Sequence, residues 1–149
     1  MKFQVTFNTK WSDFDPNRHM RHTAYNDYAA EVRVRFFQEH GLSINEFAKL
    51  NIGPILFKEE TSFLKEIHIG ENITVHMALE GVSKGIERWR FTHQIFNQKG
   101  QLAAEIKVYG AWIDLLKRKL TAPPAKFVEI FEDLPKTESF KEILLKSEK

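Results

Sequence analysis

The pattern of apolar and polar positions changes its period along the chain. Phe3, Val5 and Phe7 alternate with polar residues, and this period of two predicts a β-strand over residues 3–10. Proline and Asx residues are dense over residues 11–22, which indicates a loop. Beyond that loop the period lengthens to that of a helix.

One helix is predicted over residues 23–40, and its apolar stripe is wide enough for it to be largely buried. The stripe has the i, i+3, i+4, i+7 and i+11 spacing of a helix face and consists of Tyr25, Tyr28, Ala29, Val32 and Phe36. Thr23 stands near the predicted N-cap, and Gly41 fits the residue that ends the helix. A short second helix is predicted over residues 43–50, where Ser43 opens a capping box.

After Pro54 the period returns to two, and four long strands are predicted. They cover residues 55–64, 72–80, 87–96 and 102–115. The connector Asn97–Gly100 is short and turn-forming, so the last two strands should form an antiparallel hairpin. A sheet that curves around one apolar helix buries the apolar surfaces of both layers. We therefore expect an α+β hot-dog fold, with a curved antiparallel five-stranded sheet wrapped around a long central helix.

The same pattern predicts a single domain over residues 1–149. Residues 125–132 and 137–147 are predicted to be helical and to form a C-terminal tail over residues 125–149. The first residues lack the continuous apolar core of a signal peptide, and no apolar stretch is long enough to span a membrane. We therefore expect a cytoplasmic protein with no membrane partner.

Composition removes several classes of function. The formal net charge is +2, from 22 basic and 20 acidic residues, which is too balanced to favour nucleic-acid binding. Arg88 and Arg90 would lie on one face of a strand and Trp89 and Phe91 on the other, so charge and stacking surface are separated. The chain has no Cys, which excludes a disulfide framework, a thiolate metal site and a Cys nucleophile.

Side chains that can carry chemistry concentrate just before the long helix. Two carboxylates, Asp13 and Asp15, and two imidazoles, His19 and His22, lie within ten residues. The N-terminus of a helix offers free N–H groups and a positive dipole end that can polarise a carbonyl. A nearby carboxylate can attack that carbonyl or take a proton from water. This combination suits acyl transfer or hydrolysis.

Each of these residues also has a structural interpretation. Asp residues in a loop before a helix are usually turn formers or caps, and for Asp13 a role in bracing the loop is favoured. His19 could pair with Asp13 or with a backbone carbonyl. Tyr25 and Tyr28 fit the core face of the helix. His19, His22 and Asp15 could in principle hold a metal ion, but we expect none, because the segment has a metal-free explanation.

That explanation is a resemblance to a known family. Asp13–Asp15 and Tyr25–Tyr28 resemble the signature of the 4-hydroxybenzoyl-CoA thioesterase-like family of hot-dog acyl-CoA thioesterases. The resemblance implies hydrolysis of an acyl-CoA or acyl carrier protein thioester, with Asp15 as nucleophile or general base. It implies that His22 lies beside the thioester and that N–H groups around His22 and Thr23 polarise its carbonyl. It also implies a homodimer or homotetramer, and coenzyme A is expected only as part of the substrate, with no other cofactor.

Coenzyme A is a phosphorylated anion, so basic residues are expected near the mouth of the site. The residues predicted to bind substrate are Asp13, His19, Tyr25, Lys84 and Arg88. Further basic candidates are Arg90 and residues 117–119, and each basic residue could equally be an ordinary surface charge. The apolar candidates for the acyl pocket, each of which also fits the core, are Val32, Phe57, Phe63, Trp89 and Trp112.

Two other functions compete with hydrolysis. Residues 13–19 have some likeness to the Asp-x-Asn-Pro-x-His motif of hot-dog hydratases, but Asp15 replaces the Asn and one extra residue precedes His19. Hot-dog folds host several activities, and a non-catalytic acyl-CoA-binding module is the second alternative. Hydrolysis that depends on Asp15 would separate the enzyme from the binding module.

Overall fold

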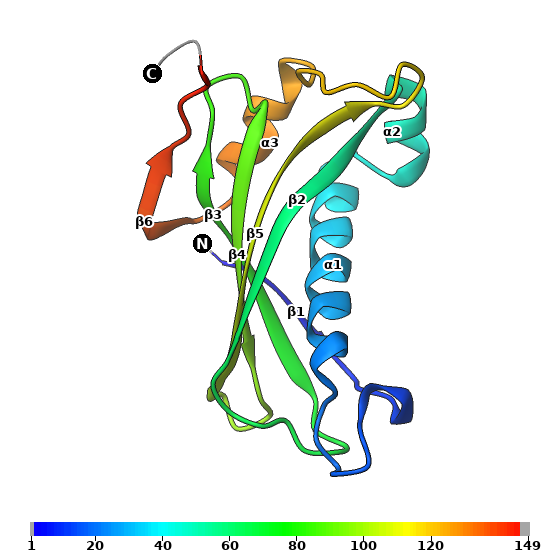
Figure 1. The fold of residues 1–149 in the computed structure, drawn as a ribbon, viewed down its shortest axis with the longest axis vertical. Helices are drawn as coiled ribbons and strands as arrows, with labels where there is room; N and C mark the ends of the chain where they lie inside the picture. Colours follow the sequence, from blue (N-terminus) through cyan, green and yellow to red (C-terminus); the bar gives the residue numbers. More distant parts are fainter. Residues whose placement is uncertain (1, 147–149) are drawn as a thin grey trace.

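The computed structural model describes residues 2–146, and a curved sheet wraps around one long helix in it (Figure 1). The strands are β1 (Phe3–Phe7), β2 (Ile52–Phe63), β3 (Ile73–Val82), β4 (Arg88–Phe96), β5 (Leu102–Asp114) and β6 (Lys136–Glu142). The helices are the 3-10 turn η1 (Trp11–Asp13), α1 (His22–Glu39), α2 (Ile44–Leu50) and α3 (Lys126–Glu132). This architecture confirms the predicted hot-dog fold. No helix within residues 2–146 has both the length and the apolarity needed to cross a bilayer.

The strand order in the sheet is β1-β3-β4-β5-β2, and β6 also pairs with β3. β1 pairs antiparallel with the first half of β3, up to Met77. β6 pairs in parallel with the second half, from Leu79 to Val82. One edge of β3 is thus covered by two strands placed end to end. β2 forms the opposite edge of the sheet, and within residues 2–146 no strand pairs with its outer side.

Two predictions about the sheet and the tail are corrected. The sheet has six strands and not five. The helix predicted over residues 137–147 is wrong over its described part, because Lys136–Glu142 form β6, while residue 147 and the rest of the tail to 149 lie outside the described residues. The cause is tertiary: the edge of β3 beyond β1 leaves unpaired backbone groups. Leu79 N donates to Pro135 O at 2.8 Å, and Ile143 N donates to Val82 O at 2.9 Å.

The predicted long helix is confirmed as α1, with a start that differs slightly. Its buried residues are Ala24, Tyr25, Ala29, Val32, Phe36 and Phe37. The N-cap is Arg21 and not Thr23. Gly41 follows the helix with φ of +82°, a backbone conformation that glycine adopts without steric cost. In the next helix Ser43 Oγ accepts the N–H of Glu46 at 3.1 Å, so Ser43 is the N-cap, but within residues 2–146 Ser43 N makes no return bond to the Glu46 side chain and the predicted capping box is only half formed.

The C-terminal end of α1 is packed into a group of rings that we call the aromatic cluster. Its members are Phe36, Phe37, Phe47, Trp112, Phe127 and Phe131. Trp112 and Phe127 meet edge to face with ring centroids 5.0 Å apart, a favoured geometry for aromatic pairs. The indole N–H of Trp112 donates to Ile86 O at 2.7 Å, so this fully buried side chain has no unsatisfied donor.

One imidazole is completely buried between α1 and the sheet. His93 Nδ1 lies 3.0 Å from His76 O, and Arg33 Nη1 lies 3.1 Å from His93 Nε2. A carbonyl only accepts and a guanidinium only donates, so the proton of His93 is on Nδ1. Burial, followed by the positive charge of Arg33, lowers the pKa of His93 to about 3. His93 is therefore a neutral structural residue.

Candidate active site

The loop that precedes α1 folds back on itself as a tight hairpin. Phe14 and Met20 form an isolated antiparallel bridge. Asp15 N donates to His19 O, and Arg18 N donates to Asp15 O, both at 2.9 Å. Arg18 adopts a left-handed conformation with φ of 67°, which closes the turn. The loop is thus held by its own backbone before α1 begins.

Asp15 is half-buried within this hairpin, and its carboxylate is held through one oxygen. Oδ1 accepts the backbone N–H of Asn17 at 2.9 Å and that of His19 at 3.3 Å. Within residues 2–146 no hydrogen bond reaches Oδ2. The carboxylate is therefore fixed in orientation by the chain, while its second oxygen can interact with a bound molecule.

Asp13 is buried and ties the loop to α1. The hydroxyl of Tyr28 donates to Asp13 Oδ2, and the backbone N–H of Lys10 donates to the same oxygen at 2.9 Å. Burial, together with the hydrogen bond to Asp13, raises the pKa of Tyr28 far above its usual value. The backbone N–H of Arg21 donates to Asp13 O at 2.8 Å. These contacts agree with a bracing role for Asp13.

The first turn of α1 presents free backbone donors next to this loop. His22 and Thr23 are its first two residues and are exposed. Their N–H groups donate to no protein atom within residues 2–146. Arg21 secures the turn, since its Nε donates to Ser12 O at 2.7 Å and its Nη1 donates to the Thr23 hydroxyl. Free N–H groups at a helix N-terminus can bind a carbonyl oxygen or an oxyanion.

A second loop, residues 64–72 between β2 and β3, packs against the hairpin. Met20 N donates to Ile67 O at 2.8 Å, and Ile69 N donates to Arg18 O at 3.0 Å. Its Glu66, His68 and Glu71 surround the site but were missed in the sequence. In the sequence, Glu66 and His68 alternate with the apolar Ile67 and Ile69, a period of two that indicates a solvent-facing side but gives no sign that they lie near His19.

Tyr25 marks the point where α1 and both loops converge. The side chain is buried, and its ring meets Phe63 of β2 edge to face at 5.1 Å. Burial raises the pKa of Tyr25, and the negative charges of Glu66, Asp15 and Glu71 raise it further. Tyr25 is therefore a neutral hydroxyl in an acidic environment. These acidic groups come from two separate segments of the chain, the hairpin and the loop between β2 and β3.

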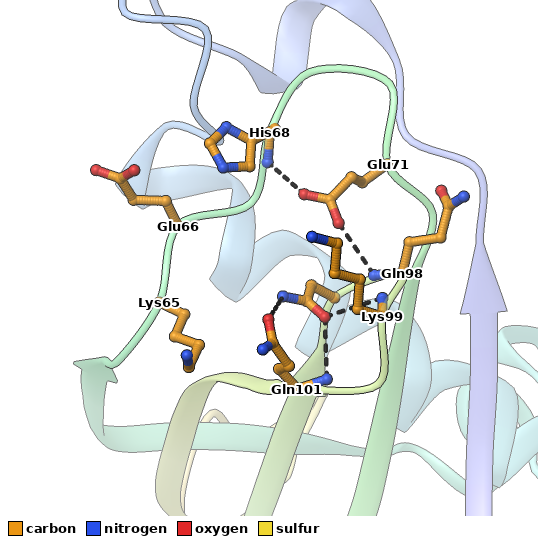
Figure 2. A pocket seen from close by; sticks show the side chains of 8 residues that line it. Lys65, Glu66, His68, Glu71, Gln98, Lys99 and Gln101 are labelled. Atoms are coloured by element: carbon orange, nitrogen blue, oxygen red, sulfur yellow. Dashed lines mark hydrogen bonds between the residues drawn. The ribbon is translucent and has the colours of Figure 1, made fainter.

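A cavity of about 690 Å³ opens beside the second loop (Figure 2). Its walls are Lys65, Glu66, His68, Glu71, Asn97, Gln98, Lys99 and Gln101. Glu71 orders this wall, because its carboxylate accepts the backbone N–H of His68 at 2.7 Å and that of Gln98 at 3.2 Å. Lys65 and Lys99 supply positive charge on opposite loops of the wall (Figure 2). The cavity is polar and suits a charged molecule.

Not all predicted substrate residues lie near Asp15. Lys84 and Arg88 are at the β3–β4 turn, at the opposite end of the sheet from the hairpin (Figure 1). The 10 residues of β3 separate the two ends by roughly 33 Å. The guanidinium of Arg88 lies over the Phe57 ring at 5.8 Å. Within one chain, the structure does not bring these two residues to the candidate site.

The apolar candidates fall into three environments. Val32 and Trp112 are fully buried in the core. Trp89 is buried and lines an apolar cavity of about 250 Å³ beside the C-terminal half of α1. Phe57 and Phe63 lie on β2 and are about half exposed, at 47% and 53%. Only Phe63 reaches the candidate site, through its contact with Tyr25.

Comparison with protein families gives this geometry a context. The family model described as the thioesterase-like superfamily matches residues 9–131, which includes both loops and most of the sheet. The chain belongs to the thioesterase-like superfamily. This membership identifies a thioester hydrolase, as the resemblance implied. No protein in the curated set matches the chain.

Several solved structures have the same fold as this member of the thioesterase-like superfamily. A Staphylococcus aureus protein solved in complex with CoA is 24% identical, with a TM-score of 0.81, and the match covers 97% of this chain and 96% of that one. A 1,4-dihydroxy-2-naphthoyl-CoA thioesterase from Synechocystis is 17% identical, with a TM-score of 0.78 and coverage of 90% and 98%. A DHNA-CoA thioesterase from Staphylococcus aureus is 19% identical, with a TM-score of 0.80 and coverage of 88% and 89%.

Proposed function

We propose that this thioester hydrolase acts on acyl-CoA, releasing the free acid and CoA, with Asp15 as nucleophile or general base. One observation carries the proposal: a carboxylate with one oxygen held and the other free lies in the loop that leads into the free N–H groups of α1. Acyl transfer needs this pairing of an oriented carboxylate with an oxyanion-binding group.

In the proposed reaction, the N–H groups of His22 and Thr23 receive the carbonyl oxygen of the thioester. As the carbonyl is attacked, negative charge develops on that oxygen, and the two donors and the helix dipole stabilise it. Loss of one such donor typically costs about 2.7–4 kcal/mol of transition-state stabilisation. The imidazole of His22, exposed at the first position of α1, would orient the carbonyl or the attacking water.

Two routes for Asp15 are compatible with this arrangement. In the first, its free oxygen attacks the carbonyl carbon and expels the CoA thiolate, and water then hydrolyses the resulting anhydride. In the second, Asp15 takes a proton from a water that attacks the carbonyl directly. Either route ends with a carboxylic acid and a CoA thiol.

Recognition of the CoA portion belongs to the same proposal. The fold is that of a Staphylococcus aureus protein solved with CoA and of thioesterases acting on an aromatic acyl-CoA, which favours acyl-CoA over acyl carrier protein. Lys65 and Lys99 line the cavity beside the site and are suited to phosphate groups. Lys84 and Arg88 would take part only if a second copy brought them to the site, as a homodimer or homotetramer would allow. A cytoplasmic location is part of this proposal.

The test is hydrolysis of a panel of aromatic, short and long acyl-CoAs, followed by release of free thiol, for the wild type and Asp15→Asn. A general base contributes roughly 10²–10⁴-fold, so the variant should lose at least that factor in kcat. Asp133→Asn makes the same change at an exposed carboxylate beyond the other end of α1, and we expect it to keep full activity.

Equal activity of Asp15→Asn and the wild type would reject Asp15 as the reacting carboxylate. Binding of acyl-CoA without hydrolysis by the wild type would instead support a non-catalytic acyl-CoA-binding module. Conversion of enoyl-CoA without thiol release would support a hydratase.

A further inference from the structure

Three possible metal ligands meet where the two loops touch. His19 comes from the hairpin, and Glu66 and His68 come from the loop between β2 and β3. One ligand atom from each of the three residues lies within 4.8 Å of the other two. His19 Nε2 is 3.0 Å from Glu66 Oε2, and the centroids of the two imidazole rings are 5.0 Å apart. We propose that His19, Glu66 and His68 bind a divalent transition-metal ion of the Zn²⁺ type.

The backbone that carries these side chains is fixed before any ion binds. His19 and His68 face each other in an isolated antiparallel bridge. Hydrogen bonds on both sides of this bridge hold the loops together, from Met20 N to Ile67 O and from Ile69 N to Arg18 O. The backbone N–H of His68 is further held by Glu71. Because the loops are already paired, binding would order side chains and not backbone.

The types of ligand match the chemistry of the ion. Imidazole nitrogens and a carboxylate oxygen bind Zn²⁺ at about 2.0–2.2 Å, usually in a tetrahedron, in which neighbouring ligand atoms are about 3.3 Å apart by geometry. The spread of 4.8 Å closes by side-chain rotation, because Glu66 and His68 are exposed. Two imidazoles and one carboxylate leave a coordination position for water, as in open zinc sites.

An ion pair alone explains only part of this cluster. The contact between His19 and Glu66 is a common surface pair, but it gives no role to His68. The imidazole of His68 makes no hydrogen bond within residues 2–146, and its ring meets that of His19 in an edge-to-face arrangement. A cation shared by all three residues accounts for the position of each. The set shares only His19 with the combination considered from the sequence, because Asp15 and His22 lie outside the cluster.

The bound ion would also inhibit the enzyme. This inhibition rests on the proposed function, whereas binding of the ion does not. The backbone N–H of His19 donates to Asp15 Oδ1. An ion bound by the His19 side chain would therefore be separated from the reacting carboxylate by His19 alone. A divalent cation stabilises a nearby carboxylate anion and weakens it as a nucleophile or base. Glu66 and His68 also line the 690 Å³ cavity, so the ion would occupy part of the cavity proposed to bind the CoA phosphate groups.

The test measures binding directly on metal-stripped full-length protein. ZnCl₂ is titrated by calorimetry, and CoCl₂ is followed by the visible absorption that a tetrahedral Co²⁺ site produces. We expect one ion per chain and a fall in affinity of at least about tenfold in His68→Ala and in Glu66→Gln, since loss of an outer-sphere partner alone already costs 10–100-fold. Both residues are exposed, so the variants should keep the wild-type Tm.

The matched control is His40→Gln. His40 Nε2 also lies 3.0 Å from a carboxylate, that of Asp133, but belongs to no three-residue cluster within residues 2–146. This variant should bind Zn²⁺ like the wild type. Affinity that is unchanged in both His68→Ala and Glu66→Gln would overturn the proposal. Because calorimetry and Co²⁺ absorption do not depend on catalysis, a failure of the thioesterase assignment would leave this result readable.

Discussion

The two ends of α1 differ in the residues that surround them and in their roles. Its first turn meets two polar loops that contribute Asp15, His19 and Glu66, and its N–H groups at His22 and Thr23 are free. Its last turns enter the aromatic cluster, where ring burial stabilises the fold. A helix offers unpaired donors at its N-terminus, so the end that can bind an oxyanion is separated by the length of α1 from the end that anchors the structure.

Each end also carries a histidine–carboxylate pair at the same distance. His19 and Glu66 are 3.0 Å apart, as are His40 and Asp133. The surroundings differ, because His40 Nδ1 donates to Phe36 O at 2.8 Å and its ring packs on Phe36 at 4.2 Å. The pair at the first turn instead faces a third ligand and a cavity. An ion pair by itself therefore does not mark a functional site, whereas its neighbours do.

The largest effect on stability should come from the aromatic end. Phe131→Ala removes a ring that packs on Phe37, Phe91 and Trp112, and we expect a loss of about 3–5 kcal/mol in the free energy of unfolding. Activity per folded molecule should stay unchanged. Urea unfolding and thiol release measure the two quantities.

For His22→Ala we expect the opposite result, a loss of activity with little change in the free energy of unfolding. The reason is that this variant changes an exposed side chain. If Phe131→Ala lowered activity per folded molecule as much as His22→Ala does, the division between the two ends would be wrong.

A smaller loss of stability should come from the hydrogen bond that braces the loop. Tyr28→Phe removes the hydroxyl that donates to the buried Asp13. A buried carboxylate that loses a donor costs roughly 1–3 kcal/mol, measured by urea unfolding. The matched control is Tyr109→Phe, whose hydroxyl makes no hydrogen bond within residues 2–146 and which should change stability by less than about 0.5 kcal/mol. Equal effects in the two variants would argue against Asp13 as a brace.

The stability of the body of the fold should depend on pH through His93. Its pKa in the folded state is about 3, below that of an unfolded histidine at about 6.5. Between these values the unfolded chain binds a proton that the folded chain does not. Stability should therefore fall as pH falls from about 6.5 towards 3, by at most about 1.4 kcal/mol per pH unit. Unfolding of His93→Gln should show a weaker dependence, and an equal slope would contradict the assignment.

The smallest effect should be at the second ion pair. Asp133 is more than half exposed, and exposed pairs contribute about 0.2–1 kcal/mol. Asp133→Asn should therefore lower the free energy of unfolding by no more than this, and less in high salt. A loss above about 2 kcal/mol would show that the pair is part of the anchored aromatic end.

Local patterns in the sequence were sufficient for α1 and the long strands, because their periods reflect which face is buried. The same rule failed for residues 136–142, where pairing with the free half of β3 outweighed a helical pattern. In the site, the segment from Asp13 to Thr23 could be recognised because it is continuous. Glu66 and His68 could not, because their nearness to His19 is created by the pairing of two distant loops.

The unequal edges of the sheet have a consequence for assembly. β3 is covered by β1 and β6, whereas the outer edge of β2 carries no strand within residues 2–146, and its Leu56, Phe57 and Phe63 are exposed. If two copies pair through this edge, each uses the same surface, so the contact is isologous and closes at two chains. The edge that remains in such a pair is the interrupted one formed by β1 and β6, and short edge strands are a poor template for pairing with a further copy.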